Sequence, residues 1–82
     1  MQSTIEVKDV FDIAGRGTVV VGTLRSGTLH VGMHTIVNGV DGKIAGIEAK
    51  GAELTIVGSE AGVLIHGLDK KQFSRGMLVY FS

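Results

Sequence analysis

The segment Asp9–Gly22 constrains the fold of this chain more than any other part of the sequence. Its two halves are rich in β-branched residues and carry an aromatic one, and such residues favour extended strands. Between the halves stands Gly15-Arg16-Gly17, which predicts a tight reversal of the chain. Glycine adopts positive φ angles and lets another part of the backbone approach closely. We therefore expect two strands joined by a short loop, with the Arg16 guanidinium facing solvent, a carboxylate or a phosphate.

Hydrophobic residues along the rest of the chain recur with a period of two, which is typical of strands with one buried face. Expected strands cover residues 5–13, 18–24, 34–38, 43–49, 54–57, 62–66 and 77–81. In the first strand the alternation slips by one near Asp9, and such a slip predicts a β-bulge. Glycines separate the strands at turn spacing, since the chain contains no proline. The only expected helical turn is Asp69–Phe73, with Asp69 as its N-cap.

Short strands at this spacing in 82 residues predict an all-β fold, a small closed barrel of six to seven strands. Closure is favoured because it removes exposed sheet edges. Shifting the sequence by 44 residues places Val19-Val20-Val21 on Val63-Leu64-Ile65, and this predicts a pseudo-twofold internal repeat. In such a repeat the loops at 14–17 and 58–61 are equivalent, and we expect them to lie close together. Val21 and Ile65 are expected inside the barrel.

Length and composition limit the class of protein. A chain of 82 residues supports one hydrophobic core, so we expect a single domain over residues 1–82. No apolar run approaches the roughly 20 residues that span a bilayer, and no secretory leader is recognisable, so a membrane partner is not expected. The sequence has no cysteine, which excludes disulfides and thiolate metal sites. These features are typical of a cytoplasmic globular domain.

Motifs for catalysis are missing from the sequence. There is no phosphate-binding loop of the Gly-x-x-x-x-Gly-Lys-Ser/Thr type, and Gly15-Arg16-Gly17 is too short for a dinucleotide fingerprint. The pair His30-x-x-x-His34 would share a face on a helix, but here it flanks a predicted turn, so no metal site is expected. No serine has a recognisable His and Asp partner. We expect neither an enzyme nor a bound cofactor.

The formal net charge is zero, from eight basic and eight acidic residues. Non-specific nucleic-acid binding is driven by contacts of Lys and Arg with phosphates, which release counterions. A neutral domain is therefore a poor general nucleic-acid binder unless its charges gather on one face.

Four further segments extend the pattern of Asp9–Gly22 in a fixed order. They are Leu24–Gly32, Gly46-Ile47-Glu48, Gly58–Leu68 and Ser74–Val79. Together the five segments resemble the second, β-barrel domain of elongation factor Tu and related translation GTPases over almost the whole chain. The resemblance implies a translation-factor-type barrel without catalytic activity. It implies the tRNA acceptor end, the ribosome or a GTPase domain as partners.

In that family the matching domain forms a pocket for the 3′-terminal adenosine of aminoacyl-tRNA. The resemblance places this pocket at six positions, namely Ile13, Gly15, Arg16, Val19, Glu48 and Leu64. Apolar side chains can pack on the faces of a purine, and Glu48 can accept hydrogen bonds from its amine or from a ribose hydroxyl. The same apolar residues would equally suit a barrel core, and Glu48 would equally suit solvent at a strand end.

The chain also departs from the family pattern. Basic and aromatic residues after Glu48 are lost, Thr23 stands where the family often has arginine, and His66 replaces the arginine before Gly67. Three functions therefore remain as alternatives: a binding module of the translation machinery, a structural or protein-interaction barrel without nucleic-acid binding, and a barrel that binds a small ligand between its glycine loops. The second alternative includes an excised, simplified or engineered form of the fold.

Overall fold

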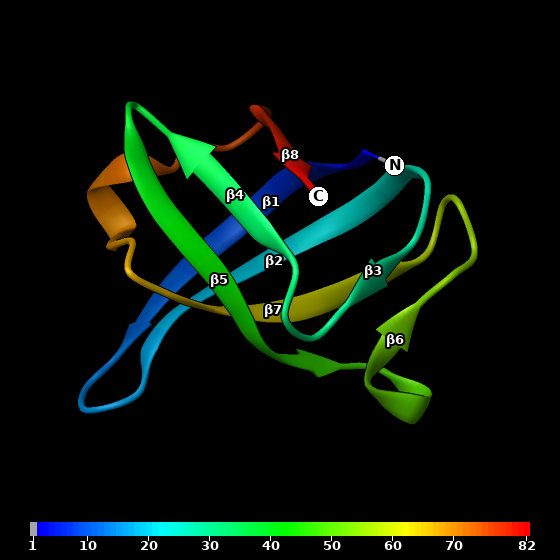
Figure 1. The fold of residues 1–82 in the computed structure, drawn as a ribbon, viewed down its shortest axis with the longest axis horizontal. Coiled ribbons are helices and arrows are strands. Elements are labelled where there is room, and N and C mark those ends of the chain that lie inside the picture. Colours follow the sequence, from blue (N-terminus) through cyan, green and yellow to red (C-terminus); the bar gives the residue numbers. More distant parts are fainter. Residues whose placement is uncertain (1) are drawn as a thin grey trace.

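The computed structural model describes residues 2–82, except for the side chain of residue 50. The strands are β1 (Ser3–Ile13), β2 (Gly17–Ser26), β3 (Leu29–His30), β4 (His34–Val37), β5 (Val40–Glu48), β6 (Glu53–Leu54), β7 (Glu60–His66) and β8 (Leu78–Phe81). Two short 3-10 turns, η1 (Lys50–Ala52) and η2 (Lys70–Gln72), complete the elements. Six strands form one antiparallel sheet in the order β4-β5-β7-β2-β1-β8, and β3 pairs with β6 (Figure 1).

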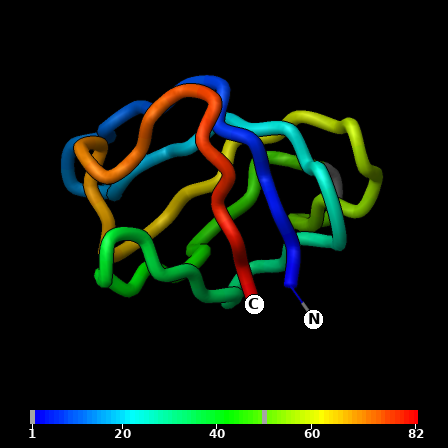
Figure 2. The backbone as a smooth tube through the Cα atoms, turned by 90° about the horizontal axis from the view of Figure 1, so that it is seen from above, coloured from blue at the N-terminus to red at the C-terminus, as the bar shows by residue number. Residues whose placement is uncertain are grey.

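The large sheet curls until its two edge strands meet, which confirms the predicted barrel. The amide of His34 in β4 donates to the carbonyl of Ser82, just beyond β8, at 2.8 Å, and the amide of Ser82 donates back at 2.9 Å. The Thr35 hydroxyl donates to the carbonyl of Tyr80 in β8 at 2.6 Å. Strands β1 and β8, the first and last of the barrel, lie side by side (Figure 2). These contacts satisfy backbone groups that an open sheet would leave exposed.

The β1–β2 hairpin has the predicted form. Ala14–Arg16 reverse the chain, and the amide of Arg16 donates to the carbonyl of Ile13 at 2.9 Å. Gly15 and Gly17 have φ angles of 75° and 131°, which only glycine adopts easily. A β-carbon on Gly17 would lie 3.0 Å from the carbonyl oxygen of Ile65, so the backbone of β7 does approach closely here. The register also shifts between Val7 and Asp9, which confirms the bulge.

The predicted helical turn is the 3-10 turn η2. The Asp69 side chain accepts a hydrogen bond from the amide of Lys71 at 2.8 Å, and the Gln72 side chain accepts one from the amide of Asp69 at 2.7 Å. This reciprocal pair is a capping box, so Asp69 is the N-cap as expected. No helix within residues 2–82 has the length and apolar character needed to cross a bilayer.

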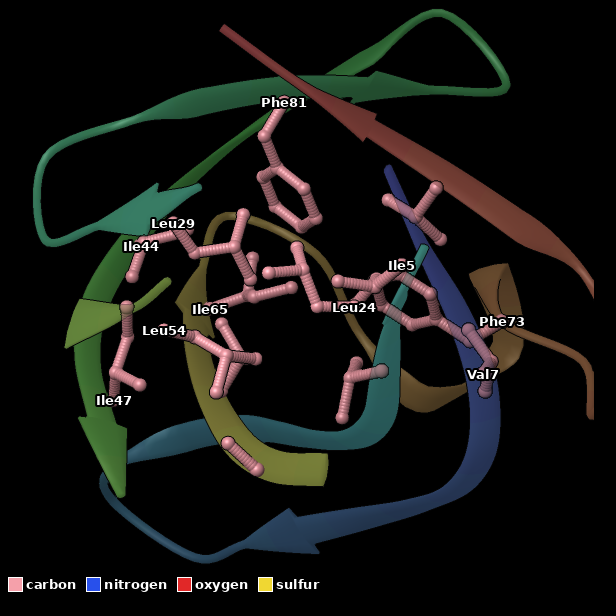
Figure 3. Packing of buried hydrophobic residues seen from close by; sticks show 14 of the residues in the cluster. Ile5, Val7, Leu24, Leu29, Ile44, Ile47, Leu54, Ile65, Phe73 and Phe81 are labelled. Carbon is pink, nitrogen blue, oxygen red and sulfur yellow. The ribbon is translucent and has the colours of Figure 1, made fainter. Parts of the chain in front are cut away.

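The core fills the inside of the barrel (Figure 3). Ile5, Leu24, Ile44, Ile65 and Phe81 are fully buried, and each comes from a different strand. The prediction for Ile65 is therefore confirmed.

The prediction that Val21 lies inside the barrel is wrong. Val20 is fully buried in the core cluster, whereas Val21 is partly exposed. Strand residues alternate between the two faces of a sheet, so only one of two adjacent valines can point inward. The sequence Val19-Val20-Val21 contains no alternation that would show which one.

The predicted proximity of the two glycine loops is also wrong. Strands β2 and β7 are antiparallel, with Thr18 opposite Ile65 and Thr23 opposite Glu60. The 14–17 loop therefore lies at one end of β7 and the 58–61 loop at the other. The shift by 44 residues also places the buried Val20 on the partly exposed Leu64. A true repeat would preserve the face on which each residue lies, so β2 and β7 do not follow the internal repeat.

Candidate functional site

Five outward-facing side chains from four neighbouring strands lie together on the outer surface of the barrel. The ladder places Phe11 opposite Val19, and Val19 opposite Leu64. Ile13 is opposite Gly17, two residues along β2 from Val19. Glu48 is opposite Gly62, which lies two residues from Leu64 along β7. We call Phe11, Ile13, Val19, Glu48 and Leu64 the outer patch.

The apolar residues of the outer patch are not part of the barrel core. Ile13, Val19 and Leu64 are absent from the buried core cluster. Phe11 and Ile13 are 50% and 38% exposed, while Val19 is 9% exposed because its neighbours on the same face cover it. Ile13 and Leu64 therefore present apolar surface on the outside of the barrel, whereas Val19 faces the same way but is almost fully covered.

Glu48 lies at the border of this apolar surface. A β-carbon built on Gly62 would lie 3.3 Å from Oε2 of Glu48 and 3.4 Å from Cγ1 of Val19. The carboxylate and the valine methyl group thus approach the same point above Gly62, where there is no side chain. An apolar surface and a hydrogen-bond acceptor are therefore adjacent at this point.

Gly15 and Arg16 lie apart from this combination, at the exposed tip of the β1–β2 hairpin. The structure thus brings Val19, Glu48 and Leu64 together, places Ile13 beside them, and leaves Gly15 and Arg16 at the margin. Arg16 does not contact Glu60, the residue that the 44-residue shift aligns with it. Glu60 is opposite Thr23, at the end of β7 that is remote from the hairpin tip.

Phe11 is a member of the outer patch that was not predicted from the sequence. The signal was present, because the bulge near Asp9 changes which residues of β1 face outward. Beyond the bulge, Val10 is buried, whereas Phe11 and Ile13 are exposed. Phe11 supplies the one aromatic ring of the patch, and aromatic rings can stack on unpaired bases.

Ion pairs engage several basic side chains on and near β1. Glu6 contacts Lys8 at 3.0 Å and Arg25 at 3.4 Å, and Asp9 contacts Arg75 at 3.4 Å. The hydrogen bond and the positive charge of Lys8, aided by Arg25, hold the pKa of the Glu6 carboxyl below its usual range. These groups lie outside the outer patch.

Three surface cavities of about 520, 200 and 320 Å³ lie elsewhere on the barrel, and none of them is lined by a residue of the outer patch. Within the described part of the chain, no group of three or more His, Asp or Glu residues has the arrangement of a metal site.

The curled antiparallel sheet, its glycine hairpin and its closing contacts define a translation-factor β-barrel, of the kind found as the second domain of elongation factor Tu. Among solved structures, the chain is similar to translation elongation factor SelB from Methanococcus maripaludis in its apo form, with a TM-score of 0.83 and 29% identity. The match covers 98% of this chain but only 18% of the SelB chain, so the barrel spans less than a fifth of that protein. No family model matches the sequence.

Proposed function

We propose that residues 1–82 form a single, non-catalytic binding module of the translation machinery, and that the outer patch binds the 3′-terminal adenosine of an RNA such as the tRNA acceptor end. The observation that carries the proposal is the position of Val19 and Leu64 on the outer surface, beside Glu48. Similarity to a translation elongation factor over 98% of the chain supports the same assignment. Such a module works in the cytoplasm, next to the ribosome or a GTPase domain.

Each group of the outer patch has a part in this proposal. Val19 and Leu64 pack against one face of the adenine, and the exposed ring of Phe11 extends this apolar surface. Glu48 accepts a hydrogen bond from the exocyclic amine or from a ribose hydroxyl, which confers identity. Arg16 extends a long side chain from the hairpin tip and contacts a phosphate. Such a contact fixes the position of the RNA but does not read its sequence.

The test is a binding titration with a short RNA hairpin that ends in a single-stranded 3′ adenosine. A second hairpin that ends in uridine measures the preference for the terminal base, and two salt concentrations measure the phosphate contacts. We expect Arg16→Ala to weaken binding by about 1–3 kcal/mol, through loss of a charge-assisted contact. We expect Glu48→Ala to reduce the preference for adenosine over uridine.

Matched variants outside the patch serve as controls. Lys71→Ala removes an exposed cation from η2, and Glu53→Ala removes an exposed carboxylate from β6. Neither should change the affinity or the base preference. A wild-type chain that binds both hairpins equally, or that binds neither, would contradict the proposal.

A protein-interaction barrel is the second candidate function, and the exposed ring of Phe11 favours it. Phe11 and Ile13 present apolar surface on the same hairpin. Contiguous exposed apolar residues are typical of surfaces that contact another protein. This candidate predicts that Phe11→Ser abolishes binding to a GTPase domain, measured by co-purification, and that no variant changes RNA binding.

A further inference from the structure

The largest of the three cavities, with a volume of about 520 Å³, lies where β4, β5 and β7 run side by side. The side chains that line it include His34, Asp41, Lys43 and His66. Ser82 also lines it and contacts His34 through the two backbone hydrogen bonds that close the barrel. The cavity is therefore formed by elements that the fold holds in a fixed register.

Three nitrogen-bearing side chains form a row across this cavity. His34 is directly opposite Lys43, and Lys43 is directly opposite His66. All three are exposed on the outer face. Directly opposite residues of antiparallel strands have β-carbons about 4.5–5.5 Å apart, so the three side chains can converge on one ligand. We call these three residues the basic row.

The side chains of the basic row have no partner among the described residues, as is also true of Arg16, Lys70 and Lys71. Lys8, Arg25 and Arg75 are held by carboxylates at 3.0–3.4 Å. In residues 2–82, by contrast, no side-chain hydrogen bond or ion pair engages His34, Lys43 or His66. Their donors are free to contact a ligand.

Asp41 is the acidic side chain that faces the same cavity, and it offsets the charge of Lys43. A protonated imidazole is a cation with two N–H donors, whereas the neutral ring has one donor and one acceptor. Because Asp41 and Lys43 carry opposite charges, each proton bound by His34 or His66 makes the cavity more positive.

We propose that the basic row binds a phosphate group, and that protonation of its two histidines strengthens the binding. Lysine binds phosphate as a point charge, and protonated imidazoles add charge-assisted hydrogen bonds. The phosphate belongs either to a small phosphorylated molecule or to the backbone of an RNA. The second source rests on the proposed function, because His66 is two residues from Leu64 along β7, at about 7 Å.

The first experiment follows the imidazole resonances by NMR while sulfate is added to the 82-residue chain. Sulfate represents the phosphate because its charge is constant between pH 5.5 and pH 8. His30 is an internal control, since it lies on β3 outside the cavity and contacts Glu53 at 3.3 Å. In a sample of residues 1–82, Ser82 carries the C-terminal carboxylate, which repels sulfate. This repulsion weakens binding at both pH values and leaves the sign of the pH effect unchanged.

We expect saturable shifts of His34 and His66, an unmoved His30, and a higher affinity at pH 5.5 than at pH 8. Lys43→Gln should weaken sulfate binding about tenfold, whereas Lys71→Gln, which removes a lysine from η2, should not.

A second experiment uses the RNA hairpin described above to identify the source of the phosphate. An RNA backbone as the source predicts that Lys43→Gln lowers RNA affinity and reduces the salt slope by about one. Unchanged RNA affinity in that variant, with sulfate binding retained in the wild type, assigns the site to a small phosphorylated molecule. Failure of the wild type to bind RNA counts against the proposed function alone. Shifts that do not saturate, that include His30 equally, or that are independent of pH would overturn the phosphate site.

Discussion

At Gly42, the packing inside the barrel leaves no room for a β-carbon. An added β-carbon would lie 2.5 Å from Cδ1 and 2.9 Å from Cγ of Leu68, and 3.0 Å from Cγ2 of Ile65. Ile65 is fully buried and Leu68 is 6% exposed, so neither side chain can move into solvent. Here glycine is required by space and not by its backbone angles.

We therefore expect Gly42→Ala to lower the free energy of unfolding by about 1–3 kcal/mol, as overpacking of a core usually does. Gly46→Ala on the same strand is the control, because its β-carbon would lie 3.8 Å from the nearest atom of Leu64, an ordinary contact. That substitution should be neutral or stabilise the protein by up to about 1 kcal/mol, through a less flexible unfolded chain. Urea unfolding of the two variants checks the difference, and equal losses would contradict it.

The elements show which parts of the fold the sequence could predict. The glycine loop at Gly15, the bulge near Asp9 and the cap at Asp69 each depend on residues close together in the chain, and all three were predicted correctly. Which face each valine of β2 occupies depends instead on pairing with β1 and β7, which are distant in sequence. A run of three valines carries no period-two signal, so the wrong residue was assigned to the core.

The candidate site could likewise be predicted only in part from the sequence. The resemblance selected Val19, Glu48 and Leu64 from three strands, and the ladder brings them together. The basic row was not found, because His34, Lys43 and His66 are spread over 33 positions and meet only through the register of β4, β5 and β7. No spacing within the sequence contains that register.

A pair of threonine substitutions tests the assignment of the β2 faces. Val20→Thr keeps the shape of the side chain but places a hydroxyl in the core, where it should cost about 1–3 kcal/mol without a partner. Val21→Thr places the same hydroxyl on the partly exposed face, where threonine is well suited to a strand, and should change stability by less than about 0.5 kcal/mol. Thermal unfolding measures both. A larger loss for Val21→Thr would reverse the assignment.

At the scale of the whole molecule, closure of the barrel brings the two edge strands of the large sheet, β4 and β8, together. Strand β8 is paired with β1 along Ser3–Glu6 and meets β4 through His34 and Thr35. Closure also forms the cavity of the basic row, since Ser82 and His34 line it. The stability of the closing contacts and the shape of the proposed phosphate site are therefore coupled.

Thr35→Val tests this coupling, because it removes the hydroxyl that donates to the Tyr80 carbonyl at 2.6 Å while keeping the side-chain volume. Thr35 is buried, so loss of the bond should lower the free energy of unfolding by about 1 kcal/mol. The loss should act locally: the amides of His34 and Ser82 should exchange with solvent faster, while amides between β1 and β2 keep their rates. Thr55→Val, at an exposed threonine beyond β6, provides the matched control and should change neither quantity. Uniform acceleration of exchange across the barrel would mean that the closing contacts open only with global unfolding, and that the β4–β8 edge is as stable as the core.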